Sequence, residues 1–202
     1  FSIVEWRLQK DLQGISKIPL EEVSSKKIIA TTRSFEYTYA DIDNIKERIS
    51  TFAARCAEKL RKQESSCHML IVQLSSDRNK KELQQHREST TVVFSSPTDS
   101  TLTISNAAVA AVKSIFKSGI KYKRAGVIVT GLVPNDNFQL NLFSSENPKH
   151  KPLMSAIDKL NKKFKSDKIK LGNQDLNRTW KMRQERLSKK FTTNINEVII
   201  VR

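Results

Sequence analysis

The sequence predicts an α+β fold in which two helices cover one face of a four-stranded sheet. Four short segments rich in β-branched residues alternate with two segments whose apolar residues recur every three or four positions. Their order is strand, helix, strand, strand, helix, strand, which is that of a split βαβ, ferredoxin-like domain. One face of such a sheet must remain free of helices. We expect a ligand to bind across that face or along its rim.

The first half of this pattern begins with a short helix at Val4–Leu12, which a linker separates from the sheet-forming part. The segment Lys27–Phe35 is rich in isoleucine and threonine and alternates along Ile29, Thr31, Arg33 and Phe35, as expected of the first strand. Apolar residues then recur over about five turns in Ile42–Leu60, the strongest helical signal in the sequence. Thr38 lies three residues before Asp41, so these side chains are predicted to form a capping box at the start of this helix.

The second half supplies the remaining strands and the second helix. Strands are predicted at His68–Leu74 and Thr91–Ser95, on either side of a charged loop from Asp77 to Glu88. The second helix spans Leu102–Lys117, and Ala125–Val133 is the fourth strand.

The length of 202 residues allows one large domain and a smaller one. We expect residues 1–24 to hold the first helix and a linker, 25–134 the main domain, 135–148 a second linker and 149–202 a small module. The chain begins with Phe1 rather than methionine, which favours a piece cut from a longer protein. No run of 18 apolar residues is present, so no membrane-spanning helix is expected.

The net charge is +15, and it is concentrated in the two larger parts of the chain. Residues 25–134 hold 18 basic and 10 acidic side chains, and residues 135–202 hold 15 and 7. Such an excess is typical of a nucleic-acid binder, although a lysine-rich soluble surface would look the same. The candidate DNA-binding residues flank the first strand and lead into the fourth: Lys26, Lys27, Arg33, Lys121, Lys123 and Arg124. In the usual arrangement these two strands lie side by side at the sheet centre, which would gather the cations.

Other kinds of site find little support. An RNA-recognition motif stacks bases on aromatic residues of its third strand, but residues 90–94 contain one aromatic side chain and no glycine. Cys56 and Cys67 are predicted to be buried and free. Asp41 and Asp43 are expected to cap a helix rather than to bind metal. We therefore expect no catalytic residue, no metal site and no cofactor in this chain.

The stretch QLNLF at 139–143 is a candidate docking peptide. Leu142 and Phe143 are large apolar side chains in a polar context, and a partner's pocket could bury them at about 1.5–3 kcal/mol each. The alternative is an ordinary edge strand over residues 138–143 that packs on its own domain.

Several segments together carry a resemblance to a known family. They are TTRSF at 31–35, FAARCAEKLR at 52–61, AAVAAVKSIFKSG at 107–119, YKRAGVIV at 122–129, QLNLF at 139–143, LMSAIDKLN at 153–161, and W-KM with LSKKFTT at 180–193. In this order they resemble the C-terminal half of the UmuC family, the catalytic subunits of bacterial DNA polymerase V and members of the Y-family of translesion polymerases. The resemblance covers nearly the whole chain, and the loop at 77–90 departs from it.

The resemblance implies that residues 1–24 hold the end of the thumb and that 25–134 are the little finger, which grips primer–template duplex. Gln139, Leu140, Leu142 and Phe143 would bind the sliding β-clamp, and residues 149–202 would be the C-terminal module, with UmuD′ or RecA as further partners. The catalytic palm and its Mg ions would lie outside this chain. The protein would act in the bacterial cytoplasm, in DNA repair and the SOS response, without a membrane partner. A stand-alone nucleic-acid-binding or protein-interaction module is the alternative.

Overall fold

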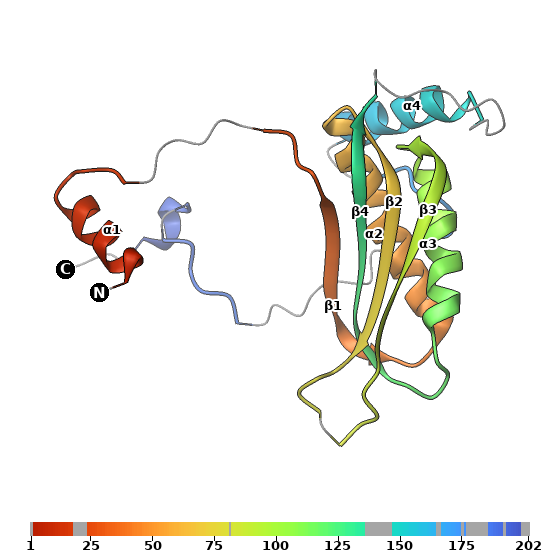
Figure 1. Cartoon of the computed structure of the whole chain (residues 1–202), viewed down its shortest axis with the longest axis horizontal. Helices are drawn as coiled ribbons and strands as arrows, with labels where there is room; N and C mark the ends of the chain where they lie inside the picture. Colours follow the sequence, from red (N-terminus) through yellow and green to blue (C-terminus); the bar gives the residue numbers. More distant parts are fainter. Residues whose placement is uncertain are drawn as a thin grey trace.

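The computed structural model describes residues 2–17, 24–80, 82–135, 147–164, 167–174, 176, 186–191 and 193–198. Figure 1 shows one twisted sheet with helices packed on one of its faces. Within the described ranges, no helix combines the length and the apolar character needed to cross a membrane.

The sheet contains four antiparallel strands: β1 (Ile29–Tyr39), β2 (Ser65–Ser76), β3 (Arg87–Thr98) and β4 (Tyr122–Pro134). Their spatial order is β1-β4-β2-β3, so the predicted α+β class and βαββαβ succession are confirmed. The first and fourth strands are neighbours, as predicted. Their expected central position is wrong for β1, because β4 inserts between β1 and β2 and leaves β1 at the edge.

Two helices, α2 (Ile42–Lys62) and α3 (Thr101–Ile115), cover one face of this sheet. The core lies between these helices and the alternate residues of the strands that point toward them. Its largest fully buried side chains include Phe35, Phe52, Ile45, Ile49, Leu60, Leu70, Leu74, Ile104 and Tyr122. Cys56 and Cys67 are both buried in this core, as the sequence predicted, and they are not joined in a disulfide.

The start of α2 differs from the predicted capping box. Strand β1 continues to Tyr39, so Thr38 is still in the sheet and cannot cap the helix. Asp41 is the N-cap instead, and its carboxylate accepts hydrogen bonds from the backbone N–H groups of Asp43 and Asn44. The interpretation of Asp41 as a helix cap rather than a metal ligand is therefore supported by the geometry.

Helix α1 (Ile3–Leu12) forms where the sequence predicted it, and a capping box between Ser2 and Glu5 fixes its first turn. None of its residues is buried. Its exposed apolar side chains include Val4, Leu8 and Leu12, which recur at steps of four. The apolar stripe of this helix is therefore exposed in the described structure.

Helix α4 (His150–Lys163) docks on the helical layer at the end of the domain where α2 finishes. Met154 is its one buried residue, at 1% exposure. The carboxylate of Asp158 accepts two hydrogen bonds from the guanidinium of Arg61 in α2, at 2.6 and 2.8 Å. Asn173 lies further along the chain and bonds to the buried hydroxyls of Ser50 and Ser105, which join α2 to α3.

Candidate nucleic-acid interface

The face of the sheet opposite the helices is the candidate interface, and we call it the open face. Cross-strand partners point to the same side of a sheet, so the strand register identifies the residues on this face. They form rows that cross all four strands. The best-defined rows are Ser34–Arg124–Ser75–Arg87, Thr32–Gly126–Gln73–Ser89 and Ala30–Ile128–Ile71–Thr91.

The first of these rows is cationic. Ser75 of β2 pairs with Arg124 on one side and with Arg87 on the other, so the two arginines stand two strand spacings apart, about 10 Å. Arg124 is exposed and donates from Nε to the hydroxyl of Ser34 at 3.3 Å. Arg87 is exposed as well. Two guanidinium groups, with the hydroxyl of Ser75 between them and that of Ser34 beside Arg124, suit phosphate oxygens, which accept from both kinds of donor.

In the second row, Gly126 places no side chain above the backbone of β4. A Cβ atom at Gly126 would lie 2.4 Å from Cγ2 of Thr32 and 2.8 Å from Nε2 of Gln73, so the neighbouring side chains close over the β4 backbone. The row therefore presents hydroxyl and amide groups close to the strand, without a bulky side chain between them. A surface of this kind allows a rigid ligand such as a duplex to approach the sheet closely.

Hydrogen bonds fix the end of the sheet that carries the arginines. The backbone N–H of Lys117 donates to the hydroxyl of Tyr122, this hydroxyl forms a hydrogen bond with Nδ1 of His86, and Nε2 of His86 forms one with the carboxylate of Glu88; each distance is 3.0 Å. Tyr122 is buried, and burial raises the pKa of its phenol. This chain of bonds ties the start of β3 to the start of β4, and so it holds Arg87 in place relative to β4.

The predicted DNA-binding residues are not brought together as one strip. Because β1 and β4 are antiparallel, Lys26 and Lys27 lie beside the end of β4, whereas Lys121, Lys123 and Arg124 lie at its start. The expectation that neighbouring strands would gather all six cations is therefore wrong.

The strand register also places the predicted basic residues on different faces of the sheet. Arg33 pairs with the buried Ala125 and points to the helical side of the sheet, away from Arg124. Lys123 lies at an irregularity in the pairing, and its amine donates to the backbone carbonyl of Glu36 at 3.0 Å. Of the six predicted residues, Arg124 is the one that the register places on the open face.

Sequence reasoning missed Arg87, which it assigned to a loop. Strand β3 begins four residues earlier than predicted, and Arg87, Ser89, Thr91 and Val93 alternate along it onto the open face. That alternation of every second residue was the available signal. Arg78 and Lys80, exposed in the β2–β3 loop, add charge near the same end.

The open face offers little for base stacking. Phe94, the aromatic residue of β3, packs against the buried core rather than on this face. Val93 occupies the open face instead, at 69% exposure, opposite Met69. This arrangement agrees with the sequence-based argument against an RNA-recognition motif.

The candidate docking peptide at 139–143, with Gln139, Leu140, Leu142 and Phe143, lies outside the described residues. Its two flanks are described. Asn135, next to the end of β4, bonds to Ser66 and Asp99, and His150, the first residue of α4, bonds to Ser100.

Comparison with known families gives two matches. The model of the impB/mucB/samB family C-terminal domain matches residues 26–142, and that of a domain of unknown function (DUF4113) matches residues 151–201.

The curated relatives include UmuC and SamB of Salmonella typhimurium and MucB of Escherichia coli. UmuC is 29% identical over 205 residues, MucB 29% over 203 and SamB 30% over 196, covering 96–100% of this chain. The chain spans about half the length of these relatives, 46–49%.

Two solved structures show a more remote similarity. They are an insertion ternary complex of Dbh DNA polymerase, with 15% identity and a TM-score of 0.45, and a complex of the β-clamp processivity factor with the little finger domain of PolIV, with 17% and 0.39. The matches cover 63% and 58% of this chain, and 35% and 99% of the respective solved chains. The assignment rests on the sequence matches: the chain belongs to the impB/mucB/samB family and corresponds to the C-terminal part of a UmuC-like Y-family DNA polymerase.

Proposed function

We propose that this chain is the DNA-binding and clamp-docking C-terminal part of an error-prone translesion polymerase that acts in DNA repair and the SOS response of a bacterial cytoplasm. Family membership supports the parent enzyme. The observation that carries DNA binding is the row Ser34–Arg124–Ser75–Arg87 on a sheet face that none of the described helices covers. Catalysis and its Mg ions would belong to the palm, outside this chain.

In this proposal the open face lies against the major groove side of primer–template duplex. Arg124 and Arg87 contact phosphates, and the hydroxyls of Ser34 and Ser75 donate to neighbouring oxygens. Phosphate contacts position a protein without identifying the base sequence. A grip of this kind suits a polymerase that must hold duplex containing damaged bases, since a lesion leaves the backbone charges in place.

Titration of a fluorescent primed duplex at several salt concentrations tests DNA binding. If about five phosphates are neutralised, log K falls with log salt at a slope near −4 to −5. Single-stranded RNA of equal length is the control, and we expect it to bind more weakly because the three described rows of the open face contain no aromatic side chain. A duplex affinity that does not change with salt concentration, or tighter binding of the RNA than of the duplex, would contradict the proposal.

The clamp-docking part rests on the resemblance of QLNLF at 139–143 to the clamp-binding peptide of the family. Replacing Leu142 and Phe143 with alanine is expected to abolish pull-down by a sliding β-clamp and to leave duplex binding unchanged. Equal loss of both activities would indicate misfolding rather than a lost contact. UmuD′ and RecA are the corresponding proposals for residues 149–202, and immobilised UmuD′ or RecA filaments provide the assay.

A further inference from the structure

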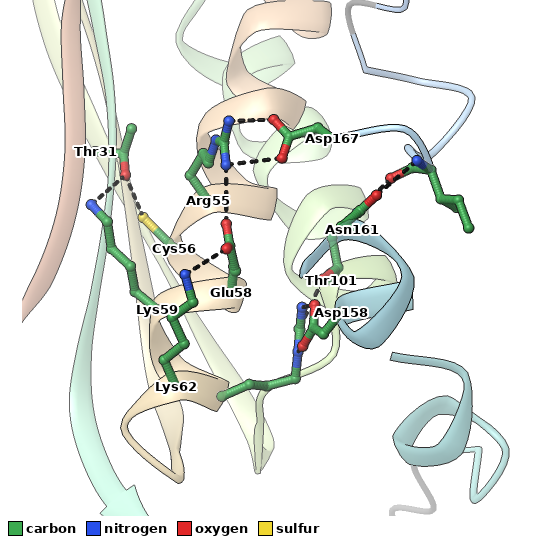
Figure 2. Close-up of polar contacts among 12 residues, drawn as sticks. Thr31, Arg55, Cys56, Glu58, Lys59, Lys62, Thr101, Asp158, Asn161 and Asp167 are labelled. Atoms are coloured by element: carbon green, nitrogen blue, oxygen red, sulfur yellow. Dashed lines mark hydrogen bonds and ion pairs between the residues drawn. The ribbon is translucent and has the colours of Figure 1, made fainter. Parts of the chain in front are cut away.

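A groove separates α2 from the C-terminal segment on the side of the domain away from the open face. Its walls are α2, the part of β1 around Thr31 and Arg33, and residues 151–174, and its volume is about 1380 Å³. Figure 2 looks into this region, with Arg55, Glu58 and Lys59 on α2 and with Asp158 on α4. We call it the C-terminal groove. It is larger than most small-molecule sites, which have volumes of about 300–1,000 Å³.

Basic side chains outnumber acidic ones around the C-terminal groove. The acidic residues are Glu58, Asp99, Asp158 and Asp167. The basic residues are Arg33, Arg55, Lys59, Arg61, Lys62, Lys151, Lys159, Lys162 and Lys170. Nine positive charges against four leave an excess of five, so the lining attracts an anionic ligand.

Three of the four acidic residues form ion pairs with basic residues of the groove. Asp158 binds Arg61 and Asp167 binds Arg55, and these two pairs join α2 to the C-terminal wall, as Figure 2 shows for Arg55 and Asp167. Glu58 binds Arg55 and Lys62, which lie with it on α2.

A second group of cations remains available to a ligand. Arg33, Lys159 and Lys162 are exposed, and they make no hydrogen bond or ion pair with any other described residue. Lys59 donates only to the carbonyl of Ala30 and the hydroxyl of Thr31. The available charges come from β1, α2 and α4, so they surround the groove rather than lie along one helix.

The rest of the lining favours a polypeptide over a nucleic acid. Phe52 is the one aromatic residue among the described lining residues, and at 2% exposure it offers no surface for stacking a base. Ile157, Ile169 and Leu171 are partly exposed and provide an apolar surface beside the cations. Cations next to apolar side chains match a peptide that mixes carboxylates with large aliphatic residues.

We propose that the C-terminal groove binds an acidic segment of a partner protein, in which Asp or Glu residues alternate with large apolar ones. The groove lies on the helical side of the sheet, so the segment and a duplex on the open face can be bound together. The site is assembled jointly by the two family-matched regions, because α2 and β1 belong to residues 26–142 and α4 to residues 151–201. This gives the C-terminal region, whose function is unknown, a binding role.

The test uses the full 202-residue chain and a fluorescein-labelled 14-residue peptide of alternating glutamate and leucine, followed by fluorescence anisotropy. Lys162→Glu reverses an available charge in the last turn of α4, and we expect about a tenfold loss of peptide affinity. Lys113→Glu is the matched control, since this exposed lysine occupies the last turn of α3 outside the groove. We expect it to change affinity less than about twofold.

Two further measurements make the test specific. Arg33→Glu, on the opposite wall, should weaken peptide binding as Lys162→Glu does, and both variants should keep wild-type circular dichroism and duplex affinity. Retained duplex affinity separates this proposal from DNA binding on the open face. Equal loss in Lys113→Glu, equal binding of a glutamate-only peptide, or displacement of the peptide by a 14-residue oligothymidylate would each overturn the proposal.

Discussion

The ion pair between Arg61 and Asp158 is predicted to hold α4 on the domain. Both hydrogen bonds are short, and the Arg61 side chain is 13% exposed while that of Asp158 is 34% exposed. A hydrogen bond to a charged group contributes about 1.5–3 kcal/mol when buried, whereas an exposed ion pair contributes about 0–1 kcal/mol. The exposure of the Arg61–Asp158 pair lies between that of a buried pair and that of a fully exposed one. We therefore expect a coupling free energy of about 1–2 kcal/mol between the two side chains.

A double-mutant cycle with Asp158→Ala, Arg61→Ala and the double variant measures this coupling. Hydrogen exchange of the α4 amides reports the free energy of undocking, and 1.4 kcal/mol corresponds to a tenfold change in protection. Both single variants should reduce α4 protection by a similar factor, because the Arg61–Asp158 pair is the contact that they share. Arg61→Ala should in addition lower the global free energy of unfolding by about 1 kcal/mol, because Arg61 also donates to the carbonyl of Asp99 and the hydroxyl of Thr101 within the main domain.

Lys163→Ala, at an exposed position of the same helix, is the control for the change in helix propensity. A coupling below about 0.3 kcal/mol would refute the reasoning, since that is the level at which distant, independent sites add. Exchange in α4 as fast as in an unfolded peptide, already in the unmodified chain, would refute it too.

Three other outcomes follow from the structure. Arg124→Ala and Arg87→Ala should each reduce the salt slope of duplex binding by about 1, as measured by anisotropy titration, whereas Lys113→Ala should leave the slope unchanged. Burial raises the pKa of the Cys56 thiol, so iodoacetamide at pH 8 should label this residue only after denaturation, as detected by mass spectrometry. Hydrogen bonds from the first turn of α2 lower the pKa of Asp41, so its ionised form stabilises the fold above the unfolded pKa and this contribution disappears as pH falls through the folded pKa. Urea titrations should therefore show the stability difference between wild type and Asp41→Asn shrinking below about pH 4.

The order of helices and strands was predictable because in each of them apolar residues recur at the spacing that places them on one buried face. The apolar face of Ile42–Leu60 and the alternation in each strand identified the buried residues without coordinates. The ends of the strands were harder to predict. Strand β3 begins four residues before its predicted start, with Arg87, Glu88, Ser89 and Thr90, which give no hydrophobic signal. Strand β1 continues four residues past its predicted end, through Glu36, Tyr37, Thr38 and Tyr39, where the pairing with β4 is irregular.

The candidate site was predicted less well, because the sequence does not show which face of the sheet a polar residue occupies. Which face a residue occupies depends on register, and a shift of one residue moves every side chain to the other side of the sheet. Arg33 and Arg124 belong to neighbouring strands, yet they point in opposite directions. The docking of α4 could not be foreseen either, because it depends on one buried methionine and on polar contacts such as Arg61–Asp158, which join residues 97 positions apart.

The contacts at either end of residues 136–146 limit how far this segment can extend from the domain. Asn135 and His150 are both fastened to the same corner of the domain, through the adjacent residues Asp99 and Ser100. A chain leaving and returning to one corner extends at most half its contour length, which is about 20 Å for the twelve steps between residues 135 and 147. A partner that bound QLNLF would therefore stay within that distance of the domain, and a longer or shorter segment between residues 135 and 147 would change this distance.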